Sequence, residues 1–180
     1  MDLKPKGNSL QYLPSIISTF RSYKSLGDRT FEQVSDNEIN YSFTEESNSL
    51  AIIVRHLNGN MLSRWTDFLN SDGEKQTRNR DAEFEGALTD KIELLQLWEE
   101  GWACLFSALE ALSEDDLSRT IYIRAEAHTV LEAINRQLSH YSYHVGQLVF
   151  LGKMICGGKW KSLSIPKGKS EQFNKEKFEK

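Results

Sequence analysis

Three histidines have the spacing expected of a metal site. His140 and His144 lie four residues apart in a segment with helical periodicity, and His56 lies in a separate predicted helix. Residues four apart project from the same face of a helix, so these two imidazoles can point at one atom, and a third from a neighbouring helix can complete a set of three nitrogen ligands. Three neutral imidazoles leave a divalent ion its full charge and an open coordination position. Such a site permits catalysis, either by activating water or by holding a thiol as thiolate.

A structural role for these histidines is the main alternative. A histidine on an apolar helix face is more often a hydrogen-bonded core residue than a ligand. Packing His140 and His144 together without a metal would leave several ring nitrogens unpaired, at a cost of roughly 1–3 kcal/mol for each. From the residues alone, both roles stay open. The fourth histidine, His128, precedes the last predicted helix and is interpreted as a loop or capping residue.

Asn60, Arg64 and Arg136 are candidates for the lining of a cavity beside the histidines. Asn60 and Arg64 follow His56 by four and eight positions, and Arg136 precedes His140 by four, so all three can share the face that carries the ligands. The arginine side chains match the geometry of carboxylates and could bind an anionic substrate. A bond from Asn60 to another helix and simple solvation of the arginines are equally consistent with the sequence.

Other residues bear on the chemistry less directly. Gln147 lies three positions after His144, where it can hydrogen-bond a ligating imidazole from behind. No general base is obvious, and the nearest acidic candidates are Asp81 and Glu83, in a segment whose position the sequence does not give. The catalytic residues are therefore unknown. Imidazole ligands suit zinc or nickel best, and iron is not excluded.

Composition indicates one globular domain. The chain has 180 residues, of which 39% are hydrophobic and 27% charged, which suits a single domain over 1–180, with a helical core at about 9–158 and a mostly solvated tail at 161–180. A net charge of -4 argues against nucleic-acid binding. The first residues lack the apolar stretch of a secretion signal, and the apolar runs are too short to cross a bilayer, so we expect a cytoplasmic protein. The two cysteines, Cys104 and Cys156, predict no disulfide framework.

Apolar residues recur at threes and fours in four segments, which predicts four long helices. Pro14 places the true start of the first helix near itself. An alternating run at Thr120–Arg124 predicts a short extended or hairpin element before the last helix, and a charged segment at 71–89 predicts a long inter-helix loop. Together these elements favour an all-α fold, a four-helix bundle. The expected helices cover 9–33, 47–70, 89–113 and 129–156.

Three stretches together resemble the DinB-like superfamily, in an uncharacterised bacterial branch, over nearly the whole chain. They are Ile52–Met61, Arg78–Glu85 and Asn135–Gln147. The resemblance implies a damage-inducible, metal-binding four-helix bundle, commonly a homodimer. It also implies a metal held by one histidine on the second helix and an H-x-x-x-H pair on the fourth, positions that His56, His140 and His144 match.

Two functions follow as expectations. The leading one is a metal-dependent enzyme acting on a small-molecule substrate, either a thiol (S-)transferase using a low-molecular-weight thiol or a hydrolase, because the superfamily includes metal-dependent transferases that use thiol cofactors. The alternative is a non-enzymatic, metal-stabilised binding or stress-response protein. A homodimer is expected from the resemblance and from the broad apolar surface of the third predicted helix, which carries Trp98, Trp102, Leu105 and Phe106. The core of a crowded bundle could also bury this surface without a second subunit.

Overall fold

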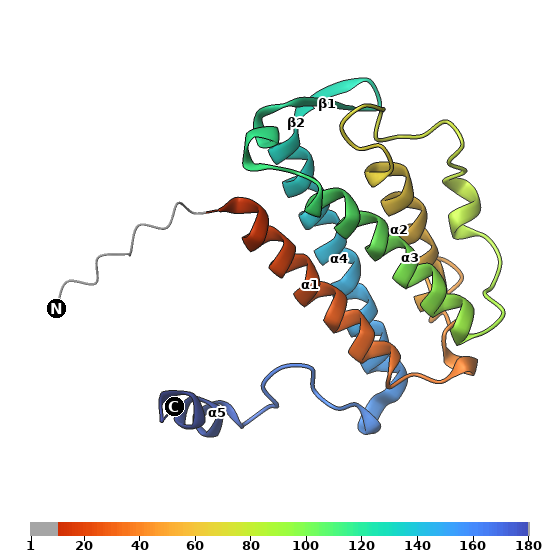
Figure 1. Ribbon diagram of the computed structural model, residues 1–180. Coiled ribbons are helices and arrows are strands. Elements are labelled where there is room, and N and C mark those ends of the chain that lie inside the picture. The colour runs from red at the N-terminus through yellow and green to blue at the C-terminus, as the bar shows by residue number, and fades with distance from the viewer. Residues whose placement is uncertain (1–10, 180) are drawn as a thin grey trace.

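The computed structural model describes residues 11–179 and is a bundle of four long helices (Figure 1). In this bundle α1 packs against α4 and α3, and α2 packs against α3 and α4. The predicted four-helix bundle is confirmed. The first helix begins at Tyr12, close to Pro14 as predicted, and residues 9 and 10, where its apolar pattern starts, lie outside the described residues. Among those residues, no helix is both long and apolar enough to cross a membrane. The helices are α1 (Tyr12–Phe31), α2 (Leu50–Trp65), α3 (Lys91–Glu110) and α4 (Val130–Cys156).

Side-chain caps fix where three of these helices begin. Ser49 accepts a hydrogen bond from the third backbone amide of α2, and Asp90 does the same for α3. Thr129 caps α4 and forms a reciprocal capping box with Glu132. Because a cap pairs backbone amides that the helix leaves free, these short polar residues locate the starts of the helices well.

The end of α2 was predicted too late. The apolar pattern continues to Phe68, yet the helix ends at Trp65. Asp67 adopts a left-handed conformation with φ of 50°, and its carbonyl accepts hydrogen bonds from the amides of Asn70 and Ser71. The ring of Phe68 still packs 4.7 Å from that of Trp65. A turn therefore buries the side chain that the pattern had assigned to another helical turn.

A hairpin covers one end of the bundle, and the 71–89 segment starts beside it and runs along the side of the bundle to the start of α3 (Figure 1). Strands β1 (Thr120–Ile123) and β2 (Glu126–Thr129) pair antiparallel, as the alternating run predicted. The Asp72 carboxylate accepts hydrogen bonds from the amides of Arg124 and Ala125 at the hairpin turn, at 2.9 and 2.8 Å. These contacts fix the start of the 71–89 segment. Short 3-10 helices occupy Asp36–Glu38, Asp81–Phe84, Glu114–Ser118 and Gly157–Lys159.

Most of the large apolar side chains of α3 are buried within one chain, although Ile92, near its start, is 66% exposed. Trp98, Trp102 and Leu105 are buried in the core. Phe106 is half-buried and stacks on Trp102 with ring centroids 5.7 Å apart. Of the two partners that the sequence left open for these side chains, the core of the same bundle is the one observed, since they fill the space between helices of a single bundle. The homodimer itself stays a prediction that rests on the resemblance.

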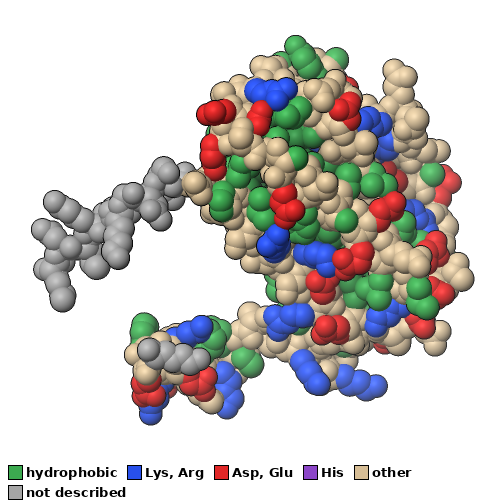
Figure 2. Space-filling view, in the orientation of Figure 1, with side chains coloured by type: hydrophobic (Ala, Val, Ile, Leu, Met, Phe, Trp, Pro, Cys, Tyr) green, Lys and Arg blue, Asp and Glu red, His purple; other side chains and the backbone are tan. Residues whose placement is uncertain are grey.

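The C-terminal tail carries a short helix that the sequence analysis did not predict. Helix α5 (Ser170–Phe178) has no buried residue and lies apart from the bundle (Figures 1 and 2). The segment before it is attached to α1, where Gln33 accepts a hydrogen bond from the Lys161 amide and Arg29 donates one to the Leu163 carbonyl. As expected, most of this tail is exposed to solvent.

Candidate metal centre

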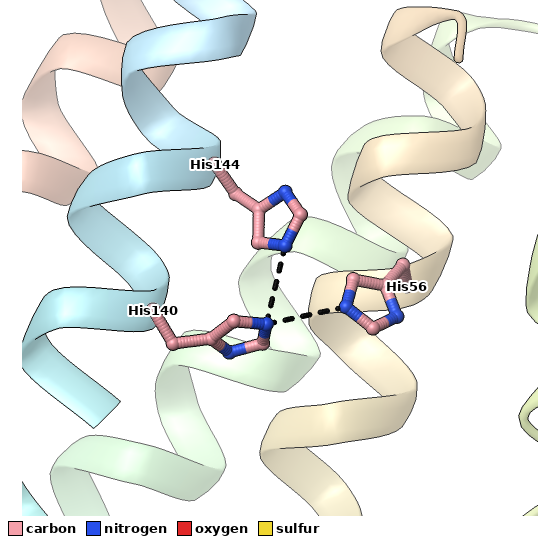
Figure 3. A group of neighbouring side chains, drawn as sticks. All are labelled: His56, His140 and His144. Atoms are coloured by element: carbon pink, nitrogen blue, oxygen red, sulfur yellow. Dashed lines mark hydrogen bonds between the residues drawn. The ribbon is translucent and has the colours of Figure 1, made fainter. Parts of the chain in front are cut away.

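The three predicted ligands converge between α2 and α4 (Figure 3). Nε2 of His140 lies 3.3 Å from Nε2 of His56 and 3.1 Å from Nε2 of His144. A zinc ion bound at about 2.0–2.1 Å by two imidazoles holds their nitrogens roughly 2.9–3.4 Å apart, for angles between octahedral and tetrahedral. Ligand atoms from all three residues lie within 4.8 Å of one another. The spacing therefore fits a single divalent ion.

Hydrogen bonds behind two of the rings fix which nitrogen carries the proton. Nδ1 of His56 lies 2.9 Å from Glu83 Oε2, and an ionised carboxylate can only accept, so Nδ1 donates and Nε2 keeps its lone pair. Nδ1 of His144 lies 2.8 Å from Gln147 Oε1, while the amide nitrogen of Gln147 donates to the Tyr143 hydroxyl. His144 therefore also presents a lone pair on Nε2. A proton on Nε2 of His140 could serve only one of these two lone pairs, whereas a cation between the three nitrogens accepts a lone pair from each ring. The donor set thus fits a metal.

Burial keeps two of the ligands neutral. Desolvation, with the positive charge of His144 and His56 adding to it, lowers the pKa of His140 to about 3. Desolvation also lowers the pKa of His144 to about 4, aided by the charge of His56 and opposed by the bond to Gln147. Only a neutral imidazole can bind a metal, so both rings are ready to ligate at neutral pH without losing a proton.

Glu83 orients His56 from behind. It lies in the 3-10 helix Asp81–Phe84 with its side chain 7% exposed. Arg78 donates to its two oxygens at 2.7 and 2.9 Å. Burial alone would raise the pKa of Glu83, but the hydrogen bonds from His56 and Arg78 outweigh burial and hold the pKa below its ordinary value. Both oxygens are engaged, so Glu83 supports a ligand and is not free to act as a general base. Asp81, the other acidic candidate, is exposed.

Gly59 makes room for this carboxylate. It lies inside α2, and a Cβ placed there would come within 2.2 Å of Glu83 Oε1 and 2.8 Å of Cδ. Glycine within a helix costs about 1 kcal/mol relative to alanine, so its presence three residues after a ligand signals a close approach. Sequence reasoning missed this signal, and it also missed the contact between His56 and Glu83.

A cavity of about 390 Å³ opens beside the three histidines. Asn60, Arg64 and Arg136 line it, as predicted. The amide oxygen of Asn60 is already occupied, because it accepts hydrogen bonds from Gln137 and Tyr141 on α4. Asn60 therefore does both things that the sequence allowed, since it bonds to another helix and also lines the cavity. The lining residues that were not predicted are Arg78, Arg80, Phe84, Arg124 and Gln137.

A second, larger cavity of about 550 Å³ lies between α2 and the segment around residues 75–83. Arg78 and Glu83 line it, but none of the histidines does. Chemistry at a metal held by the imidazoles would therefore take place in the smaller cavity.

The sequence matches a protein family over residues 7–169, a family described as Protein of unknown function (DUF1572). The chain belongs to this family. DUF1572 is a DinB-like family, so the resemblance noted in the sequence is confirmed. No curated protein sequence matches the chain.

Solved structures similar to this DUF1572 chain have the same fold. A conserved protein from Enterococcus faecalis superposes with a TM-score of 0.62 at 15% identity, over 83% of this chain and 99% of that one. The DinB-like protein YjoA from Bacillus subtilis gives 0.60 at 19%, over 82% and 96%. YfiT from Bacillus subtilis, described as a probable metal-dependent hydrolase with an unusual four-helix bundle topology, gives 0.62 at 16%, over 89% and 95%. At these identities the likeness establishes the fold alone.

Proposed function

We propose that this chain is a metal-dependent enzyme that acts on a small molecule, with one divalent ion held by His56, His140 and His144. The observation that carries the proposal is that the three converging imidazoles also line an open cavity. An ion at this point would have protein nitrogens on one side and space for a substrate on the other. A purely structural site is normally closed by a fourth protein ligand.

The residues of the chain have distinct roles in this proposal. Glu83 and Gln147 hold the imidazoles of His56 and His144 in the tautomers that ligation needs. A divalent ion bound there would supply a lowered pKa for a coordinated water or a site that favours a thiolate over a thiol. The cavity admits the second reactant and limits its size.

Two reactions are compatible with this site, and a separate observation supports each. The description of YfiT as a probable metal-dependent hydrolase supports hydrolysis. The lining of the cavity, within the described residues, contains no aspartate or glutamate that could serve as a base. A thiol, with an ordinary pKa of about 8.5, needs less help to ionise than water does, and this favours transfer of a low-molecular-weight thiol.

Cobalt substitution tests the proposal and separates the reactions. The ion is replaced by Co²⁺, and the visible spectrum is recorded while cysteine is added to millimolar concentration. A sulfur-to-cobalt charge-transfer band would support the transferase. A spectrum that responds to azide but not to cysteine would support the hydrolase. If neither ligand changes the spectrum, the open position does not exist, and a non-enzymatic binding or stress-response role replaces the enzyme.

A further inference from the structure

The cavity beside the histidines is strongly basic. Five of its lining residues are arginines, and no aspartate or glutamate lines it among the described residues. We propose that these arginines bind an anionic group of the substrate, a carboxylate or a phosphate, next to the metal centre. This inference rests on the proposed function, because it names the class of substrate that the same site accepts. The arginines are Arg64, Arg78, Arg80, Arg124 and Arg136.

Arg64 gives the strongest indication that a ligand belongs here. Its side chain is only 4% exposed, yet Nε and Nη1 have no hydrogen-bond partner among the described residues. Its ion pair, from Nη2 to Glu74 Oε2, is long at 3.7 Å. Leaving donors of a buried charged group unpaired is costly. A guanidinium in this state, lining a cavity, is suited to an oxyanion that enters from solvent.

The carboxylates nearby are too few to neutralise the arginines. Glu74 is shared by Arg64, Arg78 and Arg124, at 3.7, 3.2 and 3.3 Å. Glu83 is the second carboxylate, and it is already bound to Arg78 and to His56. Asp72 is a third carboxylate close by, since the charge of Arg64 is among the causes that lower its pKa. Five guanidinium groups therefore face three carboxylates, which leaves an excess of two positive charges before any metal is added.

Two arginines at the edge of the cavity have no acidic partner. Arg80 and Arg136 are exposed, and within residues 11–179 neither forms an ion pair. The guanidinium of Arg80 lies over the ring of Phe84, 5.2 Å from its centroid. Stacking on an aromatic ring limits the motion of this side chain and leaves its N–H groups available. These two arginines would complete the anion site from the solvent side.

An oxyanion is the ligand that this arrangement recognises best. A guanidinium offers parallel N–H donors that match two oxygens of a carboxylate or phosphate, and such bidentate, charge-assisted bonds are among the strongest in proteins. The buried Arg64 would contact the anion in low-dielectric surroundings, where the attraction is least screened. A neutral carbonyl or hydroxyl oxygen could accept a hydrogen bond from Arg64 but would leave its charge uncompensated.

The test uses metal-free protein, so that an anion cannot be bound by the metal. Sodium malonate and sodium phosphate are titrated calorimetrically into the full chain, against sodium chloride at equal ionic strength. The Arg80→Gln/Arg136→Gln variant should bind the preferred anion at least about tenfold more weakly, since one charge-assisted contact contributes roughly that factor. An Arg21→Gln/Arg29→Gln variant removes the same charge from α1 and should bind as the wild type does. A preference for malonate would identify a carboxylate, and a preference for phosphate a phosphate group.

Either of two results would overturn the inference. The first is the absence of any binding beyond that of chloride. The second is an equal loss of affinity in the control variant, which would show that only overall charge matters. An Arg64→Gln variant, checked for folding by thermal unfolding, adds a test of the buried donor. Cobalt spectra of the same variants, recorded after separate loading with Co²⁺, keep the two proposals apart, because loss of anion binding with an intact response to cysteine or azide would remove only the anion site.

Discussion

Replacing Gly59 with alanine tests whether Glu83 prepares His56 for the metal. The new Cβ would lie 2.2 Å from Glu83 Oε1, whereas non-bonded contacts are comfortable at about 3.5 Å, so the carboxylate must retreat by more than about 1 Å. The 2.9 Å hydrogen bond to Nδ1 of His56 would then be lost. Removing the hydrogen-bonding partner behind a ligating histidine typically weakens metal affinity by about 10- to 100-fold.

Gly146 provides the matched control. It lies in α4 only two residues from His144, but a Cβ there would meet no atom within 4 Å. Alanine at this position should stabilise the helix by up to about 1 kcal/mol and leave metal affinity unchanged. Affinities are measured by competition with a chromophoric chelator at pH 7. If Gly59→Ala binds metal as tightly as Gly146→Ala and the wild type do, the role assigned to Glu83 is wrong.

Three further predictions concern protons, the second supported ligand and assembly. In metal-free protein, His140 and His144 have pKa values of about 3 and 4, below the 6.5 of an unfolded histidine, so the unfolded chain takes up protons first as the pH falls. The free energy of unfolding, measured with urea, should therefore decrease from pH 6.5 to 4. The decrease should be smaller in the His140→Gln/His144→Gln variant, and an equal decrease in both proteins would contradict this prediction. Gln147→Leu should weaken metal binding by about tenfold, because it removes the acceptor for Nδ1 of His144, and an unchanged affinity would argue against that role. Sedimentation at micromolar concentration should show a homodimer, and a monomer at every concentration would refute that expectation.

The sequence predicted the fold well because its signals are local. Apolar residues at threes and fours indicate helices, and polar caps such as Ser49 and Asp90 set their first residues. The convergence of two candidate ligands was predictable for the same reason, since the spacing of His140 and His144 fixes their relation on one helix. The end of α2 was harder to predict. A turn at Asp67 buries Phe68 to the same extent that another helical turn would, so the apolar pattern does not distinguish the two.

Contacts made by the long loop were not predictable in the same way. Glu83 reaches His56 across 27 positions, and nothing in the local sequence says which helix the loop approaches. Whether the Nε and Nη1 donors of Arg64 find partners depends likewise on where Glu74 and the hairpin lie. The sequence left the partner of the α3 surface open for a related reason, because apolar periodicity shows that Trp98 and Trp102 are buried but not whether their neighbours belong to the same chain. Gly59 was the one local sign of the loop, since it marks where another segment approaches α2.

The central claim is that His56, His140 and His144 hold one divalent ion. Its most direct test is the metal content of protein purified without an affinity tag, measured by elemental analysis for the wild type, for His140→Ala/His144→Ala and for His128→Ala. The geometry predicts one ion per chain in the wild type and in His128→Ala, and almost none in the double variant. Equal metal content in the double variant and the wild type would contradict the assignment.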